Sequence, residues 1–478
     1  MKLDATLQDA GAPLPVDLLI EHGVVITMDA GRRILYDGSL AIAGREIVAV
    51  GEASELAGRF AAKKVIDARG KAVLPGFVDT HHHFLQNYLK GSRDDLALAE
   101  WIDKVSAPRI VMAVADYAAG RRELQDYCTR MGCAEALLSG ITCILNMEWA
   151  THPDLIGVYE QAGIRAVHTL TMTDYDQWGR PGMLMPMPEA FRLADQLVER
   201  CQSSKDGLVS FRYGLACPNS CTCDLMSDAR QRARRQGVGV HIHIAETKFE
   251  WDNMAQRYGK TPVQLLYDLD FLGPDVLGAH CVWLNDEDIE LMRQTGTAVA
   301  HNPECNMKVA DGIAPIAKMA EAGVIISLGT DSCAVNDNMD MFEAARVAAF
   351  LQKVSTNNPA VLPAYQVLEM ATLGGARALG VGDRLGSLEA GKLADLILVD
   401  LSGWHLRPIN SLVNNLVYCA SAARDVHTVI VNGRVVVEDR RLLTLNAEQV
   451  YAEAEAYAAR RFAAAGLAVS PYYAHLLR

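Results

Sequence analysis

Apolar residues follow two different periods along this chain. Between residues 16 and 72, apolar and polar positions alternate in runs bounded by turn-forming residues, and the same texture returns in residues 394–401 and 426–443. A period of two is that of a β-strand with one buried face, so the first region predicts several short strands of an antiparallel sheet. We therefore expect a small discontinuous β-sandwich domain built from both chain ends, residues 1–72 plus 391–445.

The middle of the chain, residues 73–390, has a different pattern. Eight short apolar runs alternate there with amphipathic segments of helix length: AVLPGFVDTH, ITCILNM, IRAVHTL, LVSFRYG, VGVHIHIA, VLGAHCVW, GTAVAHNP and VIISLGTD. Such alternation predicts an α/β fold with a parallel sheet, here a (β/α)8 barrel of the TIM type. An open, doubly wound sheet is the alternative. Residues 446–478 form the expected C-terminal tail, with a packing helix over 446–467.

Composition and charge exclude several classes of protein. Half of the residues are hydrophobic and 22% are charged, which is typical of a folded globular chain. The net charge is −13 and no long run of lysine or arginine occurs, so we expect no nucleic-acid partner. The N-terminus has acidic residues where a signal peptide needs an apolar core, and no apolar stretch is long enough to span a membrane. We expect a cytoplasmic protein without a membrane partner and, by default, a homo-oligomer.

Histidines gather at the ends of the predicted barrel strands. In a strand, positions i and i+2 share a face, so His81 and His83 of PGFVDTHHHFLQ point the same way. His243 ends the fifth run, with His241 one layer deeper, and His280 ends the sixth. The eighth run is followed by Asp331. Reactive groups of such barrels lie at the carboxyl ends of the strands, so these side chains predict one mononuclear metal site.

Imidazoles and a carboxylate suit a borderline divalent ion, Zn²⁺ first, with Fe²⁺ or Mn²⁺ as alternatives. Such an ion makes hydroxide available at neutral pH. Hydrolysis then needs a base for the water and an acid for the leaving group. Asp331, His280 and Glu246 are the candidates for these two roles.

The chain resembles the amidohydrolase superfamily, in its branch of aminohydrolases that act on ring-bound amino or chloro groups. The motifs that carry the resemblance are, in order, GVVITMD, PGFVDTHHH, HIHIAET, YGKTPVQLL, AHCVWL, HNPECNMKVADGIAPI, LGTD and GSLEAGKLADLILVDL. They extend over nearly the full length. The resemblance implies a hydrolase acting on C–N bonds, a deaminase of an amino-substituted N-heterocycle.

The resemblance also implies roles for single residues. The metal ligands are expected to be His81, His83, His243 and Asp331. Glu246 is expected to protonate the ring nitrogen and then the departing amine. His280, together with Asp331, is expected to orient or deprotonate the hydrolytic water.

Departures from related motifs bear on the substrate. Deaminases of adenosine-type thioethers have a histidine in a G-P-H-S-P context, where this chain reads GLACP at 214–218, and their substrate-binding arginine is replaced by Leu170. These differences disfavour a ribosyl thioether and favour a compact aromatic heterocycle, such as an oxidised purine, a pterin or a triazine. For ring contacts we expect Gln86 to hydrogen-bond, Trp101 to stack, and Asn306 to contribute.

Other readings of the chain stay open at this point. The same site would serve a triazine dechlorinase or an alkylamine hydrolase, although Glu246 favours an amine leaving group. A binuclear site bridged by a carboxylated lysine is disfavoured, because the predicted fourth strand lacks lysine. A non-catalytic scaffold of this fold would need no metal. Residues 171–190, rich in Met and Pro, are either a lid over a flat substrate or an ordinary surface or subunit contact.

Overall fold

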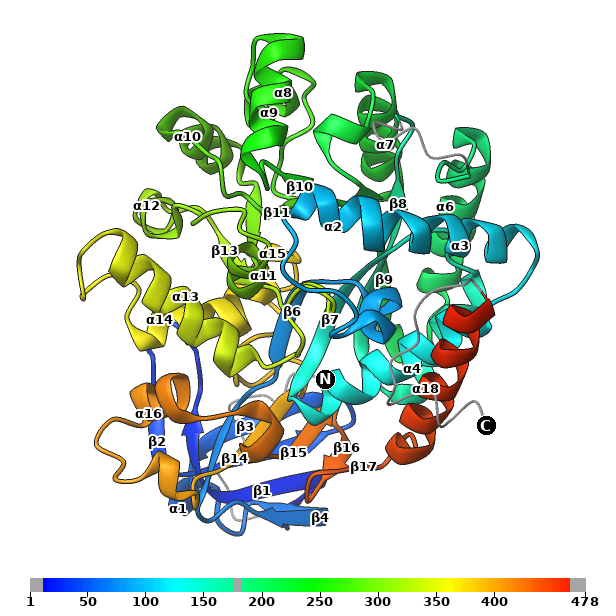
Figure 1. Ribbon diagram of the computed structural model, residues 1–478. Coiled ribbons are helices and arrows are strands. Elements are labelled where there is room, and N and C mark those ends of the chain that lie inside the picture. The colour runs from blue at the N-terminus through cyan, green and yellow to red at the C-terminus, as the bar shows by residue number, and fades with distance from the viewer. Residues whose placement is uncertain (1–11, 176–181, 465–478) are drawn as a thin grey trace.

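The structure, a computed structural model, describes residues 12–175 and 182–464. Eight parallel strands form a barrel with helices around it, as Figure 1 shows. Its strands are β6 (Phe77–His82), β7 (Ile141–Glu148), β8 (Arg165–Met172), β9 (Val209–Leu215), β10 (Gly239–Ile244), β11 (Val276–His280), β12 (Ala298–His301) and β13 (Ile326–Leu328). Each of the eight apolar runs overlaps with one of these strands. Their spatial order follows the chain without a reversal, so the barrel prediction is confirmed and the doubly wound alternative is wrong.

The first and last barrel strands meet through side chains as well as backbone. The Thr80 hydroxyl donates to the Leu328 carbonyl at 2.9 Å, and the Asp331 amide donates to the His81 carbonyl at 2.8 Å. Inside the barrel, side chains at paired positions such as Leu145, Val167 and Leu277 pack into one apolar cluster. This packed interior leaves the carboxyl ends of the strands as the place for polar groups.

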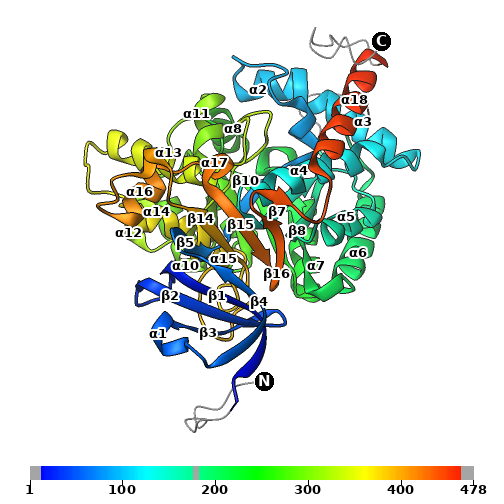
Figure 2. The same cartoon turned by 90° about the horizontal axis from the view of Figure 1, so that it is seen from below.

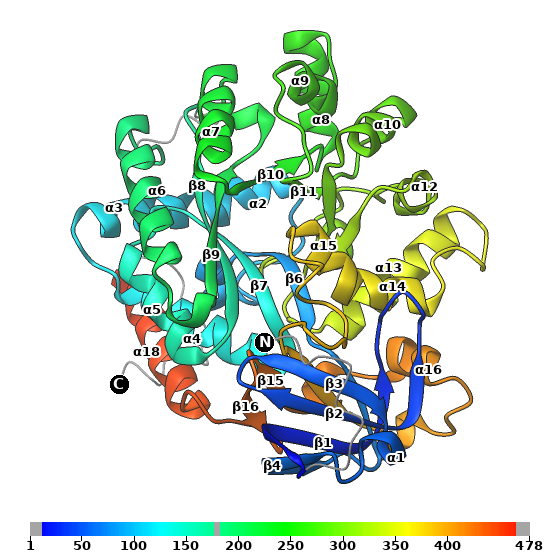
Figure 3. The same cartoon turned by 180° about the vertical axis from the view of Figure 1, so that it is seen from behind.

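Helices cover the outside of the barrel, as the view from behind in Figure 3 also shows. They are α4 (Glu123–Leu138), α5 (Ile156–Ala162), α6 (Met187–Gln202), α7 (Cys223–Gln236), α8 (Lys248–Tyr258), α9 (Pro262–Asp268), α10 (Asp286–Thr295), α12 (Ile316–Ala322), α13 (Met341–Ser355), α14 (Ala364–Glu369) and α15 (Gly375–Ala378). Local sequence sets their ends. In α7 the Thr222 side chain accepts from the Leu225 amide, and Gly237 takes the left-handed conformation after the last turn.

A separate nine-stranded sheet is built from both ends of the chain; it lies below the barrel in Figure 1, and Figure 2 shows the molecule from that side. It contains β1 (Leu14–Ile26), β2 (Ile34–Ala43), β3 (Glu46–Glu52), β4 (Phe60–Asp67), β5 (Lys71–Pro75), β14 (Leu396–Asp400), β15 (Val426–Val431), β16 (Arg434–Glu438) and β17 (Arg441–Leu442). The chain returns to the sheet where β14 pairs with β5. The short helix α1 (Ala53–Leu56) packs against β2 and β3 of this sheet, whereas α16 (Leu412–Cys419) packs against α13 and α14. The short helix α17 (Ala422–Asp425) directly precedes β15.

The expectation of a purely antiparallel sheet is wrong in one place. The long strand β1 pairs antiparallel with β2 but parallel with both β4 and β5. After the β2–β3 hairpin, α1 carries the chain back across the sheet, so β4 runs in the direction of β1. An alternating pattern predicts strands, and it contains no information on which neighbour each strand receives.

Two further segments frame the barrel mouth and its side. Residues between β6 and β7 form η1 (Phe84–Leu89), α2 (Leu98–Trp101), η2 (Ile102–Ser106) and α3 (Ala107–Ala118) before α4. The C-terminal helix α18 (Ala447–Ala464) is the packing helix expected over residues 446–467. Its Tyr457 ring lies 5.1 Å from that of Tyr127 in α4, and Arg461 pairs with Asp116 at 3.0 Å. Within the described ranges, none of the helices is long and apolar enough to cross a membrane.

Candidate functional site

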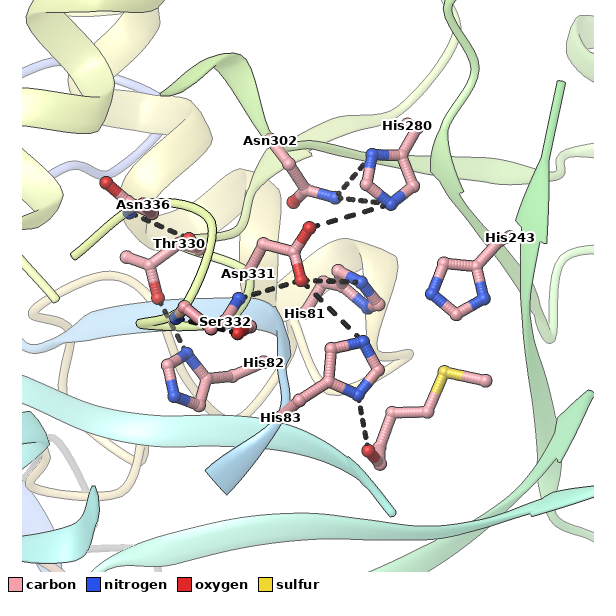
Figure 4. Close-up of polar contacts among 12 residues, drawn as sticks. His81, His82, His83, His243, His280, Asn302, Thr330, Asp331, Ser332 and Asn336 are labelled. Atoms are coloured by element: carbon pink, nitrogen blue, oxygen red, sulfur yellow. Dashed lines mark hydrogen bonds and ion pairs between the residues drawn. The ribbon is translucent and has the colours of Figure 1, made fainter. Parts of the chain in front are cut away.

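The predicted metal ligands converge at the carboxyl ends of the barrel strands, as Figure 4 shows. His81 and His83 come from the end of β6, His243 from β10, and Asp331 follows β13. The Oδ1 atom of Asp331 lies 3.5 Å from Nε2 of His81 and 3.6 Å from Nε2 of His83. Ligand atoms of the three histidines lie within 4.8 Å of one another. Side chains up to 250 positions apart in sequence therefore face one small volume.

Hydrogen bonds to the Nδ1 atoms set the tautomer of each histidine. Nδ1 of His83 lies 2.6 Å from the Met147 carbonyl, and Nδ1 of His243 lies 2.6 Å from the Ala216 carbonyl. A carbonyl only accepts, so both Nδ1 atoms carry the proton and both Nε2 atoms present lone pairs. Nδ1 of His81 lies 2.8 Å from Nε2 of His241.

These residues fit a divalent metal ion. Nε2 of His81 is buried and has no hydrogen-bond partner among the described residues. Burial lowers the pKa of His83 to about 3 and that of His243 to about 4, so both imidazoles are neutral ligands at neutral pH. Three neutral imidazoles and one carboxylate are a donor set that zinc accepts while keeping a position open for water. An orphaned buried nitrogen that points at other ligand atoms is the feature that a bound ion would explain.

Asp331 is held in an unusual backbone conformation. Its φ is +55°, in the left-handed region, and its Oδ1 accepts from the Ser332 amide at 2.7 Å. Gly329 allows the strand end to approach, because a Cβ there would lie 2.4 Å from Oδ1 of Asn302. Burial alone would raise the pKa of Asp331, but the neighbouring His280 and His83 reverse the effect and lower it. The side chain is therefore a carboxylate at neutral pH.

The two residues expected to move protons lie beside this cluster. Nε2 of His280 lies 3.5 Å from Oε1 of Glu246 and 3.8 Å from Oδ2 of Asp331. Burial, and then the charges of Asp331 and Glu250, raise the pKa of Glu246 well above its usual value. The site thus brings together a carboxyl group that keeps its proton and a carboxylate that has lost it. Two carboxyl groups with opposite protonation states supply an acid and a base in one site.

Three residues support this pair, and two of them, Glu250 and Asn302, were not singled out by the sequence analysis. The Glu250 carboxylate accepts from the amides of Ala245 and Glu246 at 3.2 and 3.1 Å, which fixes the turn after β10. Oδ1 of Asn306, in α11 (Pro303–Lys308), lies 2.9 Å from Nδ1 of His280. The Asn302 side-chain amide nitrogen, a donor, lies 3.4 Å from Nε2 of His280. The local sequence pattern does not show in which direction these side chains point.

Asn306 is therefore placed differently from the expectation. It is 1% exposed and sits behind the His280 ring, and it is absent from the described residues that line the cavity. The expected contact between Asn306 and the substrate is not what this geometry offers. His241, expected one layer deeper than His243, is buried, and its Nε2 atom lies 2.8 Å from Nδ1 of His81. His301 is buried outside the ligand cluster, and burial lowers its pKa to about 3.

A cavity of about 380 Å³ opens above the cluster. His83, His243, Glu246, His280 and Asp331 form part of its wall. Gln86 and Trp101, the two residues expected to contact a substrate ring, also line this cavity. The Gln86 Oε1 and Trp101 Nε1 atoms are buried without a hydrogen-bond partner in the described part of the chain. A buried polar atom without a partner that faces a cavity is available to a ligand.

One carboxyl group in this cavity was not foreseen. Asp311 lines the cavity at 5% exposure, and its Oδ2 atom lacks a hydrogen-bond partner among the described residues. The segment 171–190 reaches the cavity through its described flanks, with Thr173, Tyr175 and Met183 in the lining. Residues 176–181, which include Trp178, lie outside the described residues.

Comparison with known proteins agrees with this geometry. The model of the amidohydrolase family matches residues 72–436. A 5'-deoxyadenosine deaminase of Methanosarcina acetivorans is 41% identical over 92% of this chain and 96% of its own. A 5-methylthioadenosine/S-adenosylhomocysteine deaminase of Syntrophobacter fumaroxidans is 38% identical over 91% and 96%.

A solved structure gives the same result. The zinc-bound adenosine deaminase of Xanthomonas campestris superposes with a TM-score of 0.87 at 31% identity, covering 95% of this chain and all of that one. The agreement extends over the barrel and the second sheet together. The chain belongs to the amidohydrolase family, and it is a hydrolase that acts on C–N bonds.

Proposed function

We propose that this protein is a metal-dependent deaminase of an adenine nucleoside. It hydrolyses the bond between the purine ring carbon and the amino group and releases ammonia. The observation that carries the proposal is the position of Glu246. Its carboxyl group lies 3.5 Å from His280, at the wall of the cavity and beside the ligand cluster. A departing amine needs a proton, which the Glu246 carboxyl group can supply, whereas a departing chloride needs none.

The residues divide the reaction between them. His81, His83, His243 and Asp331 would hold the divalent ion, which when bound would lower the pKa of a water molecule to about 7. His280, whose Nδ1 proton is bonded to Asn306, presents Nε2 as a base toward the hydrolytic water, and Oδ2 of Asp331 shares this task. Glu246 gives its proton to a ring nitrogen and carries the next proton to the leaving amine.

The relatives support an aminated purine and give no particular support to a pterin or a triazine. The expectation against a ribosylated substrate rested partly on Leu170, but that side chain is 1% exposed and packs in the core of the barrel wall. Ala216 and Cys217, the other point of departure, line the cavity and are small. They leave room above the ring, which suits a nucleoside better than a bare base.

The 5' group of the nucleoside is expected to be uncharged. Among the described residues that line the cavity, the cationic side chain is Lys248, which already pairs with Asp252. A carboxylate carried by the substrate would therefore lack a fixed partner. The apolar wall, with Trp101, Ile110 and Trp149, instead suits an apolar substituent.

An ammonia-release screen tests this function. The metal-loaded enzyme is incubated with adenosine, 5'-deoxyadenosine, 5'-methylthioadenosine, S-adenosylhomocysteine, adenine, guanine, an aminopterin ring and an aminotriazine. We expect the highest kcat/KM for the nucleosides with a neutral 5' group. Release of chloride from a chlorotriazine without ammonia release from any purine would support the dechlorinase instead. A purified chain that binds no ion and turns over none of these compounds would support the scaffold.

A further inference from the structure

A second group of potential metal ligands lies beside the first. Oε1 of Glu246, Nε2 of His280 and the thiol of Cys305 offer ligand atoms within 4.8 Å of one another. They come from three different elements: the turn after β10, the end of β11, and α11. All three residues line the cavity, and both His280 and Cys305 are 1% exposed. A carboxylate, an imidazole and a thiolate together form a donor set that favours zinc and softer ions.

The distance between two of these atoms is already that of a coordination shell. Nε2 of His280 and Oε1 of Glu246 lie 3.5 Å apart. Two ligands of a tetrahedral ion, each about 2.0–2.1 Å from it, are separated by about 3.4 Å. The spacing of these two atoms therefore matches that of two ligands of one ion.

The surroundings of this group have an excess of acidic side chains. The Asp311 carboxyl faces the same cavity with a buried oxygen that lacks a hydrogen-bond partner among the described residues. Burial, followed by the charge of Glu246, raises the pKa of Asp311 to about 9. The Cys305 side chain lies beside the Asp331 carboxyl group. A divalent cation bound here would offset this excess of acidic groups.

We propose that Glu246, His280 and Cys305 form a second, inhibitory site for a zinc or cadmium ion, separate from the ion held by the histidine cluster. This site differs from the lysine-bridged binuclear centre, because β9 reads VSFRYGL and has no lysine. An ion bound here occupies the atoms of Glu246 and His280 that transfer protons. The effect on rate rests on the proposed function of these two residues, whereas the binding itself does not.

Titration with Cd²⁺ tests the site by two independent measurements. The enzyme, first loaded with one equivalent of metal, receives further Cd²⁺ while bound metal, thiolate-to-cadmium ultraviolet absorption and ammonia release are followed. We expect one additional equivalent to bind, an absorption band to develop with it, and the rate to fall in parallel. Zn²⁺ is expected to inhibit in the same way without the band.

Variants at Cys305 separate this site from non-specific inhibition. In Cys305→Ser and Cys305→Ala, the band should vanish and the inhibitory concentration should rise by about tenfold or more, each measured against the variant's own uninhibited rate. Cys419→Ser, in α16 and remote from the cavity, is the matched control and should behave as the wild type. The proposal is overturned if no second equivalent binds, or if the band and the inhibition persist in both Cys305 variants. A second equivalent that binds without lowering the rate would contradict the role of Glu246 and His280 and leave the metal site standing.

Discussion

The Nδ1 atom of His81 lies 2.8 Å from Nε2 of His241, whose own Nδ1 lies 3.0 Å from the Leu277 carbonyl. The carbonyl accepts, so His241 carries its proton on Nδ1 and accepts from His81 through Nε2. Burial lowers the pKa of His241 well below its usual value, which keeps the ring neutral and this order fixed. The lone pair of Nε2 in His81 consequently points at the ligand cluster.

Replacing His241 by phenylalanine is expected to weaken metal binding about 10- to 100-fold. The variant keeps a planar ring but removes the acceptor for Nδ1–H of His81, and it also lowers the free energy of unfolding by about 1–3 kcal/mol. Competition with a chelator of known affinity measures the first effect, and denaturant unfolding measures the second. His152→Gln, at the protein surface, is the control and should match the wild type. Unchanged metal affinity in His241→Phe would show that the pair does not orient His81.

Glu246→Gln is expected to reduce ammonia release from an adenine nucleoside by about 10²- to 10⁴-fold. The amide cannot deliver a proton to the ring or the amine, while the ligand cluster stays intact, so the metal content should remain at one equivalent. A 6-chloropurine nucleoside should lose less activity, because chloride leaves without a proton. Glu287→Gln, on the exposed start of α10, serves as the control. Equal losses with both substrates would contradict a role for Glu246 in leaving-group departure.

Asn306→Ala is expected to lower kcat by about tenfold while KM changes little. Its Oδ1 atom holds Nδ1–H of His280 at 2.9 Å, so the variant disturbs the base and leaves the cavity wall unchanged. Steady-state kinetics with the best nucleoside of the screen measures kcat and KM of the variant and of the wild type. A rise in KM at constant kcat would restore the original expectation that Asn306 contacts the substrate.

The pH dependence of stability is expected to report on His168. This side chain of β8 is buried, and burial lowers its pKa to about 3, against about 6.5 in an unfolded chain. Between these values the unfolded state takes up a proton that the folded state does not. The contribution to stability is therefore present above about pH 6.5 and is lost as pH falls, by about 1.4 kcal/mol per pH unit.

Comparison of the wild type with His168→Gln isolates this contribution. Buried carboxyls such as Glu148 and Glu250, whose pKa burial raises to about 7, act in the opposite direction in both proteins. Denaturant unfolding of the metal-free proteins between pH 4 and 6 should give a slope that is smaller by about one proton in the variant. Identical slopes would mean that His168 titrates normally in the folded protein.

Much of the fold and of the ligand cluster follows from local patterns. The eight barrel strands are visible as short apolar runs, and the spacing of His81 and His83 places both on one face of a strand. The barrel then brings every strand end to one rim, so His243 and Asp331 join them. The supporting residues were not predictable in this way. Asn306 lies in the short helix α11 and Asp311 in the loop that follows it, and the direction of both side chains depends on what packs around them.

The positions of strands and helices, and the chemical groups at the strand ends, could be predicted from the chain alone, because both follow from the alternation of side chains along a regular backbone. Which of these groups are in contact depends on the folded barrel. The tautomer of His81 depends on His241, 160 positions away, and the protonation of Glu246 depends on burial beside Asp331. Hydrogen-bond partners and burial depend on which side chains the fold brings together, and these side chains come together only when β6 and β13 lie side by side and close the barrel.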